Sequence, residues 1–175
     1  MNFNSPEFFF FLPISLVIYA MLFRREMLRD AWLLAISYFF YMSWNWKYAG
    51  LIALSTLIDY YVGVALAREE DPKRRKRLLI LSMTSNLGLL GLFKYYNFFL
   101  EVGQAAAGPL GLDLAFLRHE LLLPVGISFY TFQTMSYTID VYRRELPTEH
   151  SLLKFAVFVT FFPQLVAGPI EHAEL

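Results

Sequence analysis

The chain has 175 residues and no formal net charge, and 57% of its residues are hydrophobic, among them 18 Phe, 11 Tyr and 3 Trp. This composition excludes an ordinary soluble domain and predicts an integral membrane protein that is stable in the lipid bilayer. Cysteine is absent, which excludes disulfides, thiolate metal sites and a cysteine acyl-enzyme within this chain.

Two apolar segments open the chain, at residues 8–23 and 31–46. The first is preceded by Glu7 and followed by Arg24-Arg25, whereas a secretory signal peptide carries its positive charge before the apolar core. We therefore interpret it as an uncleaved span with its N-terminus outside. Lys47 follows the second segment and marks a predicted tight turn.

The third and fourth predicted spans are residues 48–67 and 78–93, joined by a basic loop at 68–77. Asp59 lies near the middle of the third span, where a carboxylate facing lipid costs at least ~2.5–3.5 kcal/mol. We therefore expect Asp59 to face the interior of a helical bundle. The sequence leaves open whether it is a structural hydrogen-bonding group or lines a path for substrate.

Residues 123–142 form a segment that is long enough to cross a membrane and too polar to face lipid. At about 100° per residue, Tyr130, Gln133, Tyr137 and Asp140 share one face of a helix. The opposite face is mostly apolar and carries Val125, Ser128, Phe132, Met135 and Ile139. A polar stripe at membrane depth must face protein or water, so these side chains either line a cavity or hydrogen-bond between helices.

A last apolar segment, residues 152–167, brings the prediction to about six membrane segments. The predicted fold is an all-α, polytopic transmembrane helical bundle, with residues 1–175 in a single membrane-embedded domain. The sequence ends shortly after the turn Gly168-Pro169 without a polar tail. We therefore expect this chain to be a fragment or an early-terminated product.

The distribution of Lys and Arg predicts the orientation of these spans. Five of the 15 basic residues form the run at 73–77, which is typical of a cytoplasmic anchor and not of a nucleic-acid partner. The predicted spans place twelve basic residues on one side and three on the other, so the first set is predicted to be cytoplasmic. The twelve are Arg24, Arg25, Arg29, Arg68, Lys73, Arg74, Arg75, Lys76, Arg77, Arg143, Arg144 and Lys154, and the three are Lys47, Lys94 and Arg118.

The signatures of soluble enzymes are absent from the sequence, which has no phosphate-binding glycine loop, no HExxH pair and no G-x-S-x-G elbow. His119 lies in a predicted loop, His150 precedes a span, and His172 follows a Gly-Pro turn, so each fits an ordinary surface or interfacial position. We therefore predict no catalytic residue, no metal site and no bound cofactor in this chain.

Five stretches of the sequence resemble the membrane-bound O-acyltransferase family, in its bacterial alginate O-acetylase branch. They are residues 8–14, Asp59-Tyr60 with Gly63, residues 93–98, residues 123–142, and residues 162–164 with 167–171. The resemblance covers the whole of this chain, in order. It corresponds to only the N-terminal part of a family member. The catalytic histidine of that family lies in a Trp-His-Gly context, which this sequence lacks, so no histidine here takes that role. His172 also departs from the arginine that relatives often have after Gly-Pro-Ile-Glu.

The resemblance implies a partial fold of this family in the bacterial inner membrane, with several passes and an extracytoplasmic N-terminus. Such proteins enclose a funnel in which an acyl group moves from a cytoplasmic donor to an external polysaccharide. This chain would supply one wall of the funnel, lined by Tyr130, Gln133, Tyr137, Asp140 and Asp59. The donor is open between acetyl-CoA and an acyl carrier, and the implied partners are the C-terminal half of the domain and periplasmic polysaccharide-modifying proteins.

The implied activity is acetyl transfer to hydroxyls of an exported polysaccharide such as alginate, and the chain alone is expected to be inactive. Within the enzyme class, the alternatives are peptidoglycan O-acetylation and teichoic acid D-alanylation. Outside it, the alternative is a non-catalytic transport or export-assembly subunit that uses the polar stripe of residues 123–142 as a permeation or docking surface.

Overall fold

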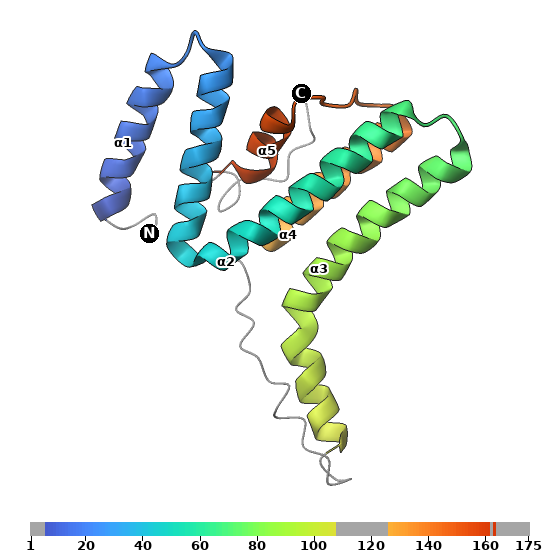
Figure 1. Ribbon diagram of the computed structural model, residues 1–175. Helices are drawn as coiled ribbons and strands as arrows, with labels where there is room; N and C mark the ends of the chain where they lie inside the picture. Colours follow the sequence, from blue (N-terminus) through green and yellow to red (C-terminus); the bar gives the residue numbers. More distant parts are fainter. Residues whose placement is uncertain (1–5, 108–125, 162, 164–175) are drawn as a thin grey trace.

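The computed structural model describes residues 6–107, 126–161 and 163, apart from the side chains of residues 44, 45, 48, 97, 106 and 107. The regular structure of these residues is entirely helical, which confirms the predicted all-α class. Figure 1 shows the five labelled helices, which are α1 (Pro6–Met21), α2 (Glu26–Arg68), α3 (Pro72–Ala107), α4 (Ile127–Arg143) and α5 (Leu152–Thr160).

Helix α2 is one continuous helix that bends sharply near its middle (Figure 1). The sequence predicted two spans here, 31–46 and 48–67, with a turn at Lys47, whereas the helical backbone continues through that position. Close to the bend, the hydroxyl of Ser43 donates a hydrogen bond of 2.5 Å to the carbonyl of Phe40. Such side-chain bonds compete with the helical ladder and favour bending.

Helix α1 packs antiparallel to the first half of α2 (Figure 1). Phe8 and Phe11 of α1 contact the ring of Phe40, with centroids 6.0 and 6.3 Å away. The indole of Trp32 donates a hydrogen bond of 3.2 Å to the carbonyl of Ser15. This pair of helices forms a small apolar cluster of its own, apart from the main core.

The main core lies where the second half of α2 meets α3, α4 and α5 (Figure 1). Its largest fully buried side chains include Tyr130 and Tyr137 of α4, Phe155 of α5 and Leu66 of α2. The rings of Tyr137 and Phe155 lie 4.8 Å apart between centroids. Helix α4 is therefore packed on several sides by protein, while the C-terminal half of α3 extends away from the bundle (Figure 1).

Local sequence explains where α3 and α5 begin. Asp71 precedes Pro72, and its carboxylate accepts a hydrogen bond of 3.1 Å from the backbone N–H of Lys73, which caps α3. Ser151 caps α5 in the same way by accepting from the N–H of Lys154 at 3.3 Å. The basic run 73–77, predicted as a loop, therefore forms the first turns of α3.

Helix α4 begins later than the sequence predicted and ends where it predicted. The predicted segment starts at residue 123, whereas the helix starts at Ile127 after Gly126, whose φ is 79°. Pro124 lies outside the described residues. Arg143 occupies the last turn and Arg144 terminates the helix with a φ of 64°, as expected for cations at a helix C-terminus.

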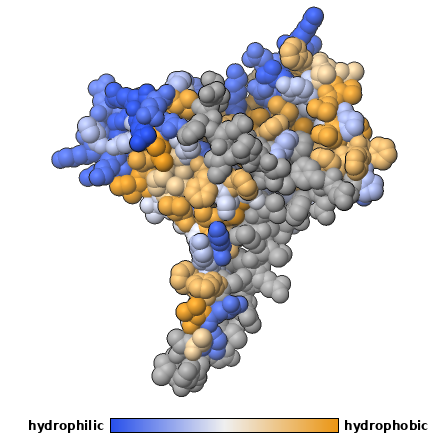
Figure 2. All heavy atoms as spheres, turned by 180° about the vertical axis from the view of Figure 1, so that it is seen from behind, coloured by the Kyte–Doolittle hydropathy of each residue, from blue (hydrophilic) through white to orange (hydrophobic). Residues whose placement is uncertain are grey.

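Two helical stretches are long and apolar enough to cross a membrane, Ala49–Arg68 in α2 and Pro72–Tyr96 in α3, and α1 is a shorter apolar helix. These stretches agree with the predicted membrane protein, but the count of about six spans is not confirmed for the described residues. Figure 2 shows hydrophobic side chains spread over the face of the bundle below a hydrophilic upper edge.

Replacing Gly63 by alanine is expected to destabilise the fold by up to about 2 kcal/mol, because the methyl group crowds the Tyr137 side chain by more than the helix propensity of alanine offsets. A Cβ at this position meets the Tyr137 ring at 3.1 Å and its hydroxyl at 3.2 Å. Gly50→Ala is the matched control, since no atom lies within 4 Å of that Cβ, and alanine favours a helix by up to about 1 kcal/mol. Thermal unfolding in detergent measures both variants, and equal midpoints would contradict the tight contact.

Candidate functional site

Asp59 lies in the interior of the bundle, as predicted, with none of its surface exposed. Its carboxylate accepts a hydrogen bond of 2.5 Å from the hydroxyl of Ser82. The side-chain amide of Asn86 lies 2.8 Å from each carboxylate oxygen. Asp59 is therefore held from α3 by neutral donors, and no ion pair involving it is found among the described residues.

Polar side chains of α2 and α4 add to the hydrogen bonds around Asp59. Ser55, one turn before Asp59, donates a hydrogen bond of 2.8 Å to the Asn86 carbonyl oxygen. On α4, Thr134 hydrogen-bonds to Asp59, and the hydroxyl of Thr138 lies 3.4 Å from that of Ser82. We call Ser55, Asp59, Ser82, Asn86, Thr134 and Thr138 the Asp59 cluster, which links α2, α3 and α4.

The sequence interpretation singled out Asp59 and missed its partners. Ser82 and Asn86 are four residues apart in an apolar helix, and so are Thr134 and Thr138. Side chains four residues apart share a helix face, so each pair marks a polar strip that needs a buried partner. That spacing is the signal by which these residues are recognisable.

The predicted polar stripe of α4 faces protein along most of its length. Tyr130, Gln133 and Tyr137 are buried, whereas Phe132 on the opposite face is 44% exposed. The amide of Gln133 donates a hydrogen bond of 3.0 Å to the carbonyl of Phe158 in α5. The stripe is therefore the side of α4 that packs against the other helices.

The remaining members of the stripe differ in their polar contacts. The hydroxyl of Tyr137 accepts a hydrogen bond of 3.1 Å from the backbone N–H of Glu149. Asp140 is partly exposed near the end of α4, where its carbonyl accepts from the N–H of Glu145 at 2.9 Å. Tyr130 is 1% exposed, and its hydroxyl is the one buried side-chain polar atom without a hydrogen-bond partner among the described residues. An unpartnered buried group of this kind costs about 1–3 kcal/mol.

Arg75 lies between the C-terminal ends of α2 and α4, and it is 7% exposed. Its guanidinium donates to the carbonyls of Leu66 and Glu69 on one side and of Val141 and Tyr142 on the other. The Tyr142 ring centroid lies 5.7 Å from the guanidinium carbon. These are carbonyls at two helix ends, where the helix itself leaves acceptors in excess, and of the four Val141 also accepts from the N–H of Arg144 at 3.1 Å. One side chain therefore supplies donors to two helix ends with negative dipoles.

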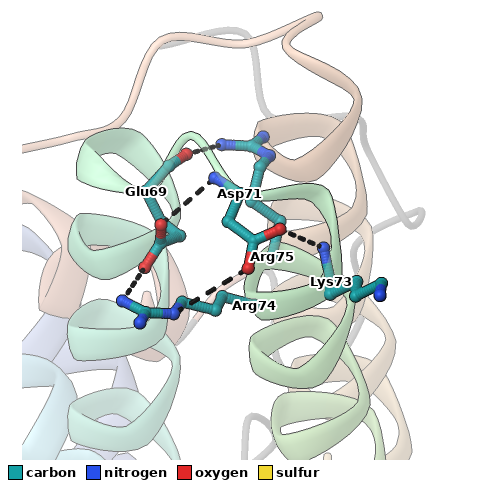
Figure 3. A network of polar contacts seen from close by, with 5 residues as sticks. All are labelled: Glu69, Asp71, Lys73, Arg74 and Arg75. Atoms are coloured by element: carbon teal, nitrogen blue, oxygen red, sulfur yellow. Dashed lines mark hydrogen bonds and ion pairs between the residues drawn. The ribbon is translucent and has the colours of Figure 1, made fainter.

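The surroundings of Arg75 are a charged turn and an open cavity. Figure 3 shows Arg74 in ion pairs with Glu69 and Asp71, at 3.7 and 3.8 Å. The cavity has a volume of about 560 Å³ and is lined by residues 66–70, 75, 141 and 144–148. Its lining combines three arginines, at 68, 75 and 144, with three glutamates, at 69, 70 and 145.

Of the three histidines, only His150 is described, and it is exposed. Its carbonyl accepts a hydrogen bond of 2.6 Å from the hydroxyl of Tyr60. His119 and His172 lie outside the described residues. Among the residues that the structure describes, no group of three or more His, Cys, Asp or Glu side chains is arranged to hold a metal ion.

Comparison with known proteins finds relatives that match nearly the whole chain. A probable alginate O-acetylase of Pseudomonas putida is 42% identical over 97% of this chain, and one of Pseudomonas aeruginosa is 41% identical over the same share. A peptidoglycan O-acetyltransferase of Helicobacter pylori is 35% identical, again over 97% of this chain. The chain spans about a third of the length of these relatives, at 35%, 32% and 37%. No protein-family model and no solved structure matches the sequence.

The relatives found are O-acetyltransferases by name, and the chain resembles them over 97% of its own length. More particularly, its resemblance to the alginate O-acetylase branch of the membrane-bound O-acyltransferase family is confirmed over 97% of its length.

Proposed function

We propose that this chain is part of a membrane O-acyltransferase that moves acetyl groups onto hydroxyls of an exported polysaccharide such as alginate. The observation that carries the proposal is the 42% identity to a probable alginate O-acetylase over 97% of the chain. Residues 1–175 would form part of a single membrane-embedded domain in this enzyme. Because the sequence has no Trp-His-Gly segment, the 175-residue chain alone is expected to be inactive.

A complementation experiment tests this proposal. The complete gene that encodes this chain is expressed in an alginate-producing bacterium from which its own O-acetylase gene has been deleted. We expect the acetyl ester content of the secreted alginate, measured by NMR, to be restored, while expression of residues 1–175 alone leaves it at background. Unacetylated alginate with the complete gene would count against this acceptor.

Peptidoglycan is the second candidate acceptor, favoured by the 35% identity to a peptidoglycan O-acetyltransferase. The two acceptors are distinguished by where the ester appears. Acetylated muramic acid in the cell wall of the same strain, together with unacetylated alginate, would favour peptidoglycan.

We further propose a multi-pass protein of the bacterial inner membrane with its N-terminus outside the cytoplasm. Three basic turns support this orientation, Arg24-Arg25, residues 68–77 and Arg143-Arg144. The helix ends that carry these turns lie toward the same upper edge in Figure 1, where Figure 2 shows hydrophilic side chains. A reporter enzyme fused at Lys73 should be active in the cytoplasm only, and a periplasmic signal from that fusion would reverse the proposed orientation.

In the same proposal, this chain forms one wall of the reaction funnel, with Asp59, Tyr130, Gln133, Tyr137 and Asp140 along it. Acetyl-CoA or an acyl carrier supplies the acyl group from the cytoplasm, and periplasmic polysaccharide-modifying proteins are the expected partners. The support is the resemblance to probable alginate O-acetylases. Within the described residues Asp59, Tyr130, Gln133 and Tyr137 are buried, and Asp140 is partly exposed. Copurification of such periplasmic proteins with the tagged enzyme tests the partnership.

A further inference from the structure

The open cavity beside Arg75 lies at the depth of the lipid headgroups. Its lining includes the turn between the two stretches that are able to cross a membrane, Ala49–Arg68 and Pro72–Tyr96. A turn that joins two such stretches lies at the membrane surface, whichever side that surface faces. The cavity volume of about 560 Å³ is within the range of roughly 300–1,000 Å³ that is typical of small-molecule sites. A phospholipid headgroup therefore has access to a cavity of sufficient size.

Half of the charged side chains that line the cavity have partners within the protein. The carboxylate of Glu69 forms an ion pair with Arg74 at 3.7 Å and accepts a hydrogen bond of 3.1 Å from a backbone N–H of the same turn (Figure 3). Glu145 forms an ion pair with Arg143 at 3.8 Å. The guanidinium of Arg75 donates to four carbonyls. These three groups are therefore engaged by the protein itself.

The other three charged side chains of the lining are free to bind a ligand. Arg68, Glu70 and Arg144 are exposed, and their side chains form neither a hydrogen bond nor an ion pair with any residue that the structure describes. Arg68 ends α2 and Arg144 follows α4, so the two guanidiniums come from separate helices. The unpaired set of the cavity is thus two cations and one anion.

This set of charges matches a zwitterion better than a simple anion. A guanidinium binds a phosphate through two parallel N–H donors, and a carboxylate accepts a strong hydrogen bond from a primary ammonium. A phosphate without a cation would face the like charge of Glu70, and a quaternary ammonium has no N–H to donate. Apolar side chains complete the lining, among them Leu66, Val141 and Leu146. They offer a contact to the carbon atoms between a headgroup and its acyl chains.

We propose that this cavity binds the headgroup of an aminophospholipid, a phosphate diester with a primary ammonium, as in phosphatidylethanolamine. Arg68 and Arg144 bind the phosphate, and Glu70 accepts from the ammonium. The bound lipid connects the ends of α2 and α4 at the surface, next to the place where Arg75 connects them in the interior. The site does not depend on the proposed acetyl transfer, because it requires only that the chain is embedded in a membrane.

The test uses the complete membrane protein, extracted with detergent from vesicles of equimolar phosphatidylethanolamine, phosphatidylcholine and phosphatidylglycerol. Native mass spectrometry then counts each lipid that stays bound. Phosphatidylcholine keeps the phosphate but has no N–H, and phosphatidylglycerol keeps the phosphate without a cation. The wild type is compared with Glu70→Gln, Arg144→Gln and the control Lys76→Gln. Glutamine at 144 has the same backbone strain as arginine, and Lys76 is exposed on α3 outside the cavity.

We expect the wild type to retain phosphatidylethanolamine over each of the other two lipids by about tenfold, because neither of them forms the charge-assisted hydrogen bond to Glu70. Glu70→Gln should reduce the preference over phosphatidylcholine to near one. Arg144→Gln should lower the retention of all three lipids, since they share the phosphate. Lys76→Gln should change neither the preference nor the total retention.

Four results would overturn the inference. Equal retention of phosphatidylethanolamine and phosphatidylcholine by the wild type would show that the ammonium is not recognised, and a preference for phosphatidylglycerol would show a simple anion site. An unchanged preference in Glu70→Gln would place the ammonium elsewhere. Soluble glycerophosphoethanolamine that displaces the lipid would show that the source of the phosphate is not a lipid. None of these results bears on acetyl transfer, which the complementation experiment tests separately.

Discussion

Replacing Arg75 by alanine is expected to lower the free energy of unfolding by about 2–4 kcal/mol. The guanidinium donates to four carbonyls at the ends of α2 and α4. Without it, two helix ends with negative dipoles face one another, and the carbonyls of Leu66, Glu69 and Tyr142 lose the guanidinium donor. Thermal unfolding in detergent and the rate of proteolysis at the 66–75 turn measure the effect.

Two other substitutions show whether geometry or charge causes this loss. Arg75→Lys keeps the charge but cannot reach both helix ends, because an ammonium lacks the planar fork of a guanidinium, so it should recover only part of the stability. Arg74→Ala is the matched control, since that side chain is 70% exposed and its ion pairs are long. The control should lose less than about 1 kcal/mol. Equal losses for the substitutions at 74 and 75 would show that the helix-end contacts are unimportant.

Asp59→Ala is the second substitution with a large expected effect, a loss of about 2–4 kcal/mol of stability. The change removes the carboxylate that accepts from the Ser82 hydroxyl and the Asn86 amide in a fully buried position, and the amide keeps only its bonds to Ser82, at 3.1 Å to the carbonyl and 3.4 Å to the hydroxyl. Asp59→Asn should cost less, because its carbonyl oxygen still accepts from Asn86. Unfolding in detergent is again the measurement.

A double-mutant cycle isolates the cluster itself. Removing Asn86 in a protein that already lacks the Asp59 carboxylate should cost much less than removing it from the wild type, since the two groups are each other's partners. Strictly additive losses for Asp59→Ala and Asn86→Ala would contradict a coupled cluster and point to two independent packing defects.

The buried face of α4 was predictable from the sequence because a helix has a fixed period. Spacing alone placed Tyr130, Gln133 and Tyr137 on one side, and the structure buries all three. The end of the helix was predictable as well, from the basic pair at 143 and 144. The start of the helix was not predictable. The chain turns at Gly126 through a positive φ, and glycine can adopt either sign of φ, so the residue type alone does not indicate the turn.

The bend in α2 shows where a hydropathy pattern reaches its limit. The polar interruption near residue 47 marks a change of direction, and the sequence interpretation took it for a turn between two helices. The backbone changes direction within one continuous helix instead. Two helices joined by a turn and one bent helix place the same polar residues in the same surroundings. Composition therefore cannot distinguish these two backbones.

The position of Asp59 was predictable and its partners were not. A carboxylate in an apolar span must face the interior, which needs only a rule about lipid. Its partners lie 23 and 27 residues away on α3 and farther still on α4, so they depend on how the helices rotate against each other. Tyr130 was expected to line a cavity, and only the packed structure shows that its hydroxyl differs from that of Tyr137.

Arg144 ends α4 in the left-handed conformation, with a φ of 64°. A side chain with a Cβ is disfavoured there by roughly 1–2 kcal/mol, a penalty that glycine, as at the other end of the helix, does not have. Glycine at 144 would thus make a more stable helix end but remove one cation from the basic edge. Backbone strain therefore favours glycine at position 144, whereas the proposed cytoplasmic orientation of the basic edge favours a cation, and the sequence has arginine.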